Sequence, residues 1–340
     1  MTEATAGLVV DLAAIAANWQ QLAAAVAPAA CGAVVKADAY GLGAAEIAPA
    51  LLAAGCRHFF VATLDEGLAL RPLLPEADII VMHGIVPGRM QEYVAASLIP
   101  VLNTLRDVEQ WRGQTGSCWL QVDTGINRQG FGLDELPDLS GFTLACVMSH
   151  LACADELDHF MNVEQLRKFR ALRQRFPGLP GSFANSGGVF LGKPYHADIV
   201  RPGIALYGGF GLRPVVSLHA PVLQVRDIAA GECVGYGALW QADRPTKLAT
   251  IEAGYSEGLH RALFGRGQAF INGTKVPMIG RISMDLITLD VTGAGDVQPG
   301  MLAEILGPHQ SADQLGEASG TINYEILTSL SPRAGRRYFR

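Results

Sequence analysis

One lysine stands where an apolar, strand-like run gives way to a turn that contains glycine. Lys36 directly follows the run 33–35 and precedes Tyr40, Gly41 and Gly43. An amine at the end of a buried strand is partly desolvated, which disfavours its charged form. A neutral lysine amine is the nucleophile that enzymes use to form Schiff bases with carbonyl compounds. The alternative is a lysine whose stem packs on the strand while its amine reaches water.

Further polar positions come at or just after the ends of other apolar runs. They are Asp123, His150, Asn185 with Ser186, and Arg201. In a parallel barrel, the carboxyl ends of all strands meet at one mouth, and catalytic residues gather there. Together with Lys36, these residues predict a polar site at such a mouth. The alternative for the histidine is a core residue whose hydrogen bonds are satisfied.

The elements that must carry these residues alternate between strand and helix over the first two thirds of the chain. The expected strands are 32–36, 58–63, 78–83, 98–102, 118–123, 143–150, 182–185 and 199–207. The expected helices include 44–54, 65–74, 90–96, 105–111 and 162–175, with Asp65 and Asn162 as N-caps. This alternation predicts a parallel sheet, and eight strands fit a closed (β/α)8 barrel of TIM type. The alternative is an open, doubly wound sheet, although no GxGxxG run follows the first strand.

The character of the chain changes after about Pro221. Short strand-like runs are separated by glycine-rich turns, at 222–225, 247–251, 268–271, 275–278, 286–291 and 301–306. The dipeptide Asn272-Gly273 between two of them is typical of a β-hairpin. We therefore expect a barrel domain at residues 1–221 and a mostly β domain at residues 222–340. We also expect the first ~10 residues to pack on the second domain.

The composition argues against several classes of protein. The 340 residues carry a net charge of -6, and Lys and Arg are scattered, which argues against nucleic acid as a partner. No run is apolar for long enough to cross a membrane, and the first residues lack the pattern of a secretion signal. The six cysteines show neither CxxC pairing nor metal-ligand spacing. We therefore expect buried free thiols, no metal and a cytoplasmic protein.

Two glycine-containing turns suit a phosphate group. Asn185-Ser186-Gly187-Gly188 follows the seventh expected strand, and Arg201-Pro202-Gly203-Ile204 belongs to the eighth. Small residues ahead of a short helical turn expose backbone N–H groups, and phosphate sites in barrels often follow strands 7 and 8. The alternative is a pair of plain glycine turns.

The sequence around these residues resembles the alanine racemases over nearly the whole chain. The run 33–43 resembles the family's attachment motif for pyridoxal 5'-phosphate (PLP), which implies that Lys36 holds PLP covalently. The resemblance also implies that PLP is bound by Tyr40, His150, Ser186, Arg201, Gly203, Ile204 and Tyr324. Arg201 then faces the pyridine nitrogen, and His150 forms a hydrogen bond with Arg201.

An arginine facing the pyridine nitrogen has a chemical consequence. Arginine stays protonated and cannot act as an acid. The pyridine nitrogen is then left unprotonated, the ring is a weaker electron sink, and negative charge stays near Cα of the substrate. This arrangement favours proton transfer at Cα over transamination.

Racemisation needs a proton-transferring group on each face of Cα. The resemblance implies Lys36 on one face and Tyr236, in the run 234–238, on the other. In the family this tyrosine comes from the other subunit, so the resemblance implies a homodimer with shared active sites. It assigns substrate-binding roles to Arg128 and, from the other subunit, to Met284 and Tyr255.

The chain departs from the family pattern at two positions near the expected site. Gln121 stands where many members have a carbamylated lysine, and Leu259 stands where an aromatic residue lines the access channel. We expect a racemase of alanine that supplies D-alanine for peptidoglycan, with serine or a broader set of small amino acids as alternative substrates. A decarboxylase or β-elimination enzyme of the same fold and a non-catalytic PLP-binding protein are the other hypotheses.

Overall fold

The computed structural model describes residues 5–340 and divides into two compact units. The first unit consists of Ile15–Ala39 and Gly43–Leu212. The second consists of residues 5–14, Tyr40–Leu42 and Arg213–Arg340. Lys36 and Tyr40 therefore belong to different units, although they lie in one short turn of the chain.

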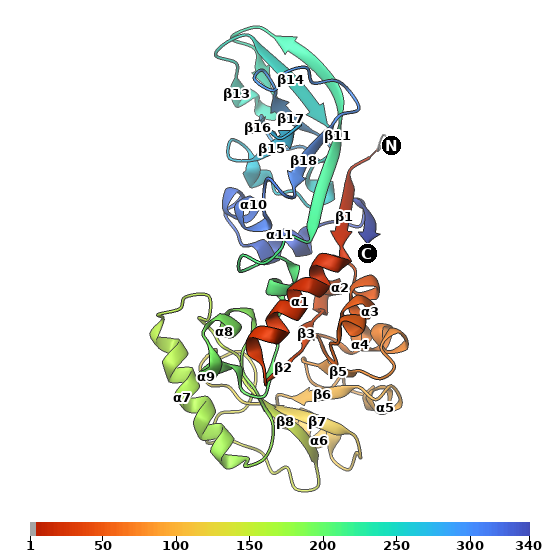
Figure 1. The fold of residues 1–340 in the computed structure, drawn as a ribbon, viewed down its shortest axis with the longest axis vertical. Helices are drawn as coiled ribbons and strands as arrows, with labels where there is room; N and C mark the ends of the chain where they lie inside the picture. Colours follow the sequence, from red (N-terminus) through yellow and green to blue (C-terminus); the bar gives the residue numbers. More distant parts are fainter. Residues whose placement is uncertain (1–4) are drawn as a thin grey trace. The chain divides into compact units, whose positions relative to one another are not determined.

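The first unit is built around a parallel sheet that closes on itself (Figure 1). Its strands are β2 (Ala30–Cys31), β3 (Ala33–Val34), β4 (His58–Val61), β5 (Asp78–Val81), β6 (Ile99–Leu102), β7 (Ser117–Gln121), β8 (Thr143–Met148), β9 (Gly181–Ser182) and β10 (Ile199–Val200). The strands β2 and β3 are the two halves of one strand that is interrupted at Gly32. Since β2 pairs with β10 and β3 pairs with β4, the ring is complete. The predicted eight-stranded barrel is confirmed.

Close packing explains why a glycine stands at position 32. A Cβ at this position would lie 2.6 Å from a ring carbon of Phe60 and 2.9 Å from the carbonyl oxygen of His58. Phe60 in turn packs edge-on against Trp119, with 5.4 Å between the ring centroids. Both rings are buried, and pairs of this kind stabilise a core by about 0.5–1.5 kcal/mol beyond the area they bury.

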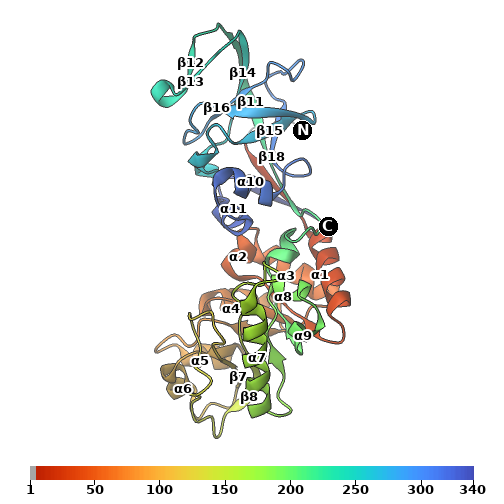
Figure 2. The ribbon, with the colours of Figure 1, turned by 90° about the vertical axis from the view of Figure 1, so that its left-hand side faces the viewer.

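Helices and short helical turns alternate with these strands, as Figures 1 and 2 show. They are α1 (Leu12–Val26), α3 (Ala44–Ala54), α4 (Leu64–Leu70), η1 (Arg71–Leu73), α5 (Met90–Ala95), α6 (Leu105–Trp111), α7 (Phe160–Arg175), α8 (Ser186–Phe190), α9 (Lys193–His196) and η2 (Ile204–Tyr207). Thr63 and Thr104 begin α4 and α6 with capping boxes, in which each threonine hydroxyl accepts a backbone N–H of the first turn.

The structure corrects three local predictions. The helix α4 is capped by Thr63 rather than Asp65, because Glu66 completes a capping box with that threonine. The helix α7 is capped by His159, and Asn162 lies inside the helix, where its Nδ2 donates to the carbonyl of Glu156 at 2.8 Å. The last strand of the barrel ends at Val200, and the 3-10 helix η2 follows, because Pro202 and Gly203 break the strand.

The second unit is mostly β, as predicted. Its strands are β1 (Gly7–Asp11), β11 (Val216–Ile228), β12 (Cys233–Val234), β13 (Trp240–Gln241), β14 (Thr246–Ile251), β15 (Gln268–Ile271), β16 (Thr274–Ile279), β17 (Ile287–Asp290), β18 (Leu302–Leu306) and β19 (Gly335–Phe339). Its helical elements are η3 (Tyr236–Ala238), η4 (Tyr255–Glu257), η5 (Arg261–Leu263), α10 (Ala312–Ser319) and α11 (Asn323–Ser329). A bulge in the long strand β11 lets it pair with β1 and β18 at one end and with β14 at the other.

The turn between β15 and β16 is the hairpin that Asn272-Gly273 predicts. Both residues have positive φ, at 50° and 75°, and Ile271 pairs with Thr274 across them. The strand β1, from the beginning of the chain, joins the same sheet between β11 and β19. The helices α10 and α11 lie side by side next to this sheet (Figure 1).

The cysteines and the helices complete the description of the fold. All six cysteines are free, and four of them, Cys31, Cys56, Cys118 and Cys146, are buried as expected, whereas Cys233 is exposed. Across residues 5–340, every helix is too short or too polar to span a membrane.

Candidate functional site

Lys36 lies just beyond the carboxyl end of β3 and is half-buried. Burial lowers the pKa of its amine below the usual value, and the nearby cation of Arg128 lowers it further. The carboxylate of Glu66 acts in the opposite direction and raises the pKa. The net effect is a lowered pKa, which favours the neutral, nucleophilic amine.

The turn after Lys36 is left-handed over four residues in succession. Ala37, Asp38, Ala39 and Tyr40 have φ values of 52°, 53°, 52° and 58°. This conformation costs L-residues about 1–2 kcal/mol each, so the turn stores on the order of 4–8 kcal/mol. Sequence reasoning did not find this feature, because only Gly and Asn are usual in such a conformation.

Neighbouring polar groups hold this turn in place. A carboxylate oxygen of Asp38 accepts the backbone N–H of Ala44 at 2.7 Å, and Glu66 accepts the N–H of Ala37 at 2.7 Å. The second oxygen of Glu66 accepts the N–H groups of Ala62 and Thr63 at the start of α4. Glu66 therefore ties the turn that carries Lys36 to the end of the neighbouring strand β4.

Arg201 is a buried cation whose hydrogen-bond partners are neutral. Its guanidinium donates to the hydroxyl of Ser182, to the carbonyl of Ser149 at 2.6 Å and to Nδ1 of His150 at 3.4 Å. Burial lowers the pKa of Arg201 to about 10, which still leaves it protonated at neutral pH. Burying a charge without a counter-charge is costly, so a cation of this kind is typical of a functional site.

His150 is neutral in this setting. Burial lowers the pKa of its imidazole to about 3, and the cations of Arg201, Arg128 and Lys36 contribute to that shift. A neutral imidazole has one nitrogen that accepts, and here Nδ1 accepts from Arg201. Lys36, Arg128, His150 and Arg201 therefore lie close enough for their charges to influence one another.

The two glycine turns meet at the hydroxyl of Ser186. Its Oγ accepts the backbone N–H of Gly203 at 2.9 Å and of Ala205 at 3.2 Å. These bonds occupy both lone pairs, so the O–H can donate to a ligand. Asn185 caps the following helix α8 by accepting the N–H of Gly188 at 2.9 Å. Ile204 begins η2, directly after Gly203.

Arg128 lies on a loop that is shaped by Asp123. The carboxylate of Asp123 accepts the N–H groups of Gly125, Ile126 and Arg128, at 2.7, 3.0 and 3.2 Å. The loop closes where Asp123 donates its N–H to the carbonyl of Phe131. Gln121, at the end of β7, is buried beneath this loop, so close to Gly130 that a Cβ there would lie 2.7 Å from its Cγ.

In the second unit, Tyr255 and Met284 lie on two segments that are bonded to each other. Tyr255 donates its N–H to the carbonyl of Ser283 at 3.1 Å, and Ser256 donates to the carbonyl of Met284 at 3.0 Å. The side chains of Tyr255 and Met284 are exposed, whereas Leu259 is buried. The leucine that replaces an aromatic residue therefore fills the core of this unit.

Arg333 joins the same two segments through ion pairs. Its guanidinium contacts the carboxylate of Glu257 at 2.9 Å and that of Asp285 at 2.6 Å. The other oxygen of Glu257, which is buried, accepts the N–H of Gly254 at 2.7 Å. The sequence offers no motif for this arrangement, because Arg333 lies some fifty residues beyond its partner Asp285.

The remaining predicted residues also lie in the second unit. The rings of Tyr40 and Tyr324 have centroids 6.0 Å apart, and burial raises the pKa of Tyr40, to which the neighbouring Tyr324 adds. Tyr236 begins the short helix η3 and is 73% exposed. Thus the structure brings Tyr40 and Tyr324 together and leaves the side chain of Tyr236 at the surface of its own chain.

Comparisons with known proteins agree with this arrangement. Family models described as "Alanine racemase, N-terminal domain" and "Alanine racemase, C-terminal domain" match residues 10–210 and 215–338. An alanine racemase of Acidiphilium cryptum is 49% identical over 97% of this chain and 97% of its own length. A protein named "Alanine racemase, catabolic" from Agrobacterium fabrum is 45% identical, over 99% of this chain and 93% of its own.

Solved structures give the same result. The crystal structure of alanine racemase from Bartonella henselae, with covalently bound pyridoxal phosphate, has a TM-score of 0.95 and 41% identity. The match covers 99% of this chain and 100% of that one. Both domains of this chain therefore match one family over nearly their full length. The chain belongs to the alanine racemase family, whose members are isomerases.

Proposed function

We propose that this chain interconverts L-alanine and D-alanine with PLP attached to Lys36. The observation that carries the proposal is the buried Arg201 cation, held by neutral partners beside the neutral His150, in the same unit as a lysine with a lowered pKa. A cation at a pyridine nitrogen and a neutral amine nearby are what a PLP racemase needs.

The two glycine turns of the first unit fit this cofactor. The hydroxyl of Ser186, fixed by Gly203, can donate to a phosphate, and Ile204 offers the following backbone N–H. Tyr40 and Tyr324 are further candidates for phosphate contacts. PLP supplies an electron-withdrawing ring that makes the Cα proton of a bound amino acid acidic.

Arg201 controls where the negative charge resides after Cα of the substrate has lost its proton. Its permanent proton stays on the guanidinium, so the nitrogen that it faces receives a hydrogen bond rather than a proton. His150 accepts from Arg201 at Nδ1 and, being neutral, adds no competing charge. Charge consequently stays near Cα, which favours return of a proton to that carbon.

Two groups then move the proton. The amine of Lys36 takes or returns it on one face of Cα, since its lowered pKa makes the neutral form available. Tyr236 of the partner subunit serves the opposite face, in a homodimer with shared sites. Tyr236 is 73% exposed in the single chain, which supports the proposal that its side chain reaches the active site of a second copy. Arg128 and the backbone of Met284 of the partner subunit hold the substrate carboxylate, and Tyr255 of the partner subunit lines the access channel.

We also propose that the enzyme supplies D-alanine for peptidoglycan in the cytoplasm. The free cysteines support a reducing compartment. Gln121 adds no charge beside Arg128, which leaves serine or other small amino acids as possible second substrates.

The test is Cα–H exchange in D₂O with L-alanine, L-serine and a panel of other amino acids, followed together with product chirality. We expect deuterium at Cα and D-alanine as product, and a Lys36→Ala variant should lose nearly all turnover. If Cα–H exchange is fastest with serine, serine rather than alanine is the preferred substrate. Bound PLP without exchange for any amino acid would favour a non-catalytic binding protein, and amine or keto-acid products would favour a different reaction.

A further inference from the structure

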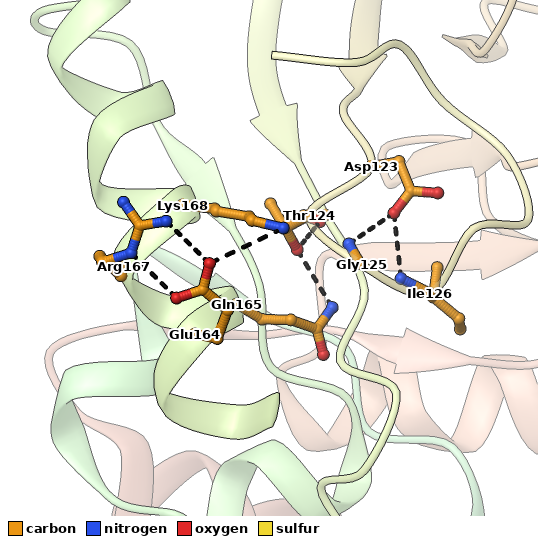
Figure 3. A network of polar contacts seen from close by, with 9 residues as sticks. Asp123, Thr124, Gly125, Ile126, Glu164, Gln165, Arg167 and Lys168 are labelled. Atoms are coloured by element: carbon orange, nitrogen blue, oxygen red, sulfur yellow. Dashed lines mark hydrogen bonds and ion pairs between the residues drawn. The ribbon is translucent and has the colours of Figure 1, made fainter. Parts of the chain in front are cut away.

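Gln165 is a fully buried polar residue in the middle of α7, and the proposed mechanism gives it no role. Its Nε2 donates to the hydroxyl of Thr124 at 3.1 Å and to the carbonyl of His150 at 2.8 Å. Its Oε1 accepts the backbone N–H of Ala152 at 2.9 Å. Figure 3 shows the side chain reaching from the helix toward the loop that follows β7.

Only a carboxamide of this length can make these three contacts. The carbonyl of His150 needs a donor, the N–H of Ala152 needs an acceptor, and the hydroxyl of Thr124 can take either role; the Gln165 side chain meets all three from a single planar group. With the amide flipped, its oxygen would face the carbonyl of His150 and its nitrogen the N–H of Ala152, so the orientation is determined. A buried group that is so completely paired rigidifies what it touches.

The contacts of Gln165 continue to Arg201 through buried groups. The hydroxyl of Thr124 is 2.8 Å from that of Ser149, and both residues are fully buried. The carbonyl of Ser149 and Nδ1 of His150 both accept from Arg201. Gln165 thus fixes the segment that supplies two of the three partners of the guanidinium.

The same amide is linked to the loop that carries Arg128. Thr124 directly follows Asp123, whose carboxylate accepts the N–H groups of Gly125 and Ile126 in that loop (Figure 3). A displacement of Thr124 would therefore move the start of this loop as well as the hydroxyl of Ser149.

We propose that Gln165 is a positioning residue that aligns Arg201 with the cofactor and thereby sets the reaction specificity. The inference rests on the proposed function. When Gln165 is lost, the 149–152 segment shifts, and Arg201 no longer holds an unprotonated pyridine nitrogen. Protonation of that nitrogen draws electrons from Cα into the ring, so that protonation on the cofactor's aldehyde carbon competes with protonation at Cα.

The competing reaction is transamination, and its atoms and electrons balance without an added oxidant. The amino group of alanine ends on the cofactor as pyridoxamine phosphate, the amine of Lys36 is released, and water supplies the keto oxygen of pyruvate. Alanine loses two electrons at Cα, and the aldehyde carbon gains them. Pyruvate formed per D-alanine formed therefore measures the alignment of Arg201.

The experiment compares the holoenzyme with three variants, for D-alanine formation, pyruvate formation, the visible absorbance of bound PLP and its dissociation constant. Gln165→Met removes the amide and keeps the length of the side chain. Thr124→Val removes only the hydroxyl that joins Gln165 to Ser149. Glu164→Gln is the matched control, because Glu164 directly precedes Gln165 on α7 and forms ion pairs at the surface with Arg167 and Lys168 (Figure 3).

We expect Gln165→Met to lower kcat about tenfold or more, with KM changed less than about threefold. The substitution leaves the buried partners of the Gln165 amide without a hydrogen bond, whereas it removes no contact with the substrate. The ratio of pyruvate to D-alanine should rise, and the absorbance of bound PLP should change. The dissociation constant should stay within about threefold, because the phosphate contacts lie elsewhere. Thr124→Val should change the ratio in the same direction by a smaller factor.

The proposal is overturned if folded Gln165→Met keeps wild-type kcat and product ratio, or if Glu164→Gln changes both as strongly. If Gln165→Met does not fold, kcat and the product ratio of Thr124→Val test the proposal instead. A wild-type chain that exchanges no Cα proton overturns the proposed function and this inference together. If the wild-type chain racemises alanine and Gln165→Met leaves kcat and the product ratio unchanged, only the inference is overturned.

Discussion

Glu66 accepts a hydrogen bond from the backbone N–H of Ala37 at 2.7 Å, and this contact reaches the first residue of the left-handed turn after Lys36. The same carboxylate accepts two N–H groups at the start of α4. One side chain therefore positions the candidate nucleophile and begins the next helix of the barrel.

We expect Glu66→Ala to lower the free energy of unfolding by about 2–4 kcal/mol, because three backbone donors lose their acceptor. Urea titration of the apoprotein measures this quantity. Glu109→Ala, at an exposed position of α6, is the control and should change stability by less than about 0.5 kcal/mol. Equal stabilities of the two variants would contradict the role assigned to Glu66.

The neutral state of His150 predicts a pH dependence of stability. The folded pKa is about 3 and the ordinary value is 6.5, so between these values the unfolded chain binds more protons. The contribution to stability is therefore present above pH 6.5 and is lost as the pH falls toward about 3. The slope approaches about 1.4 kcal/mol per pH unit.

The His150→Gln variant checks this prediction, because glutamine offers an acceptor and does not titrate. Urea unfolding at several pH values between 4 and 7 should give a shallower decline for the variant than for the wild type. Parallel curves would show that other groups cause the acid sensitivity.

Asp123→Asn should weaken substrate binding more than turnover. The asparagine oxygen can still accept from Gly125, but its amide nitrogen cannot accept the N–H of Arg128, so the loop loses a contact at Arg128, which we propose as the carboxylate-binding residue. We expect KM for alanine to rise about three- to tenfold with a smaller change in kcat. Asp138→Asn is the control, since Asp138 makes a comparable turn with Ser140 at the surface. A fall in kcat with unchanged KM would count against this role.

Arg333→Gln should raise KM and lower the temperature of thermal unfolding. The substitution leaves the buried carboxylate of Glu257 without its cation and separates the segments that hold Tyr255 and Met284. Arg244→Gln serves for comparison, because Arg244 also joins two carboxylates, those of Asp243 and Asp290. Steady-state kinetics with alanine should give a higher KM for Arg333→Gln than for Arg244→Gln, and identical KM values would refute the prediction.

The local sequence was sufficient to predict the barrel. Alternating apolar runs and helical patterns depend on neighbours in the chain, so the strands around Lys36 and the hairpin at Asn272 could be placed before the structure was known. The same local rules gave the wrong N-cap where a neighbouring residue formed a more complete set of hydrogen bonds. Thr63 displaced Asp65 as a cap because Glu66 completed its capping box.

The tertiary structure alone decided which neutral groups surround the charges. Ser182, Ser149 and Gln165 carry no pattern that marks them, and each meets its partner across a separation of 15 to 52 residues. The left-handed turn after Lys36 also contradicts the preferences of its residues, since Asp38 and Glu66 stabilise it from outside. The sequence by itself determined the elements and the polar ends of the strands, because periodicity is local. The buried hydrogen bonds that set protonation at the site arise only when distant segments close around Arg201.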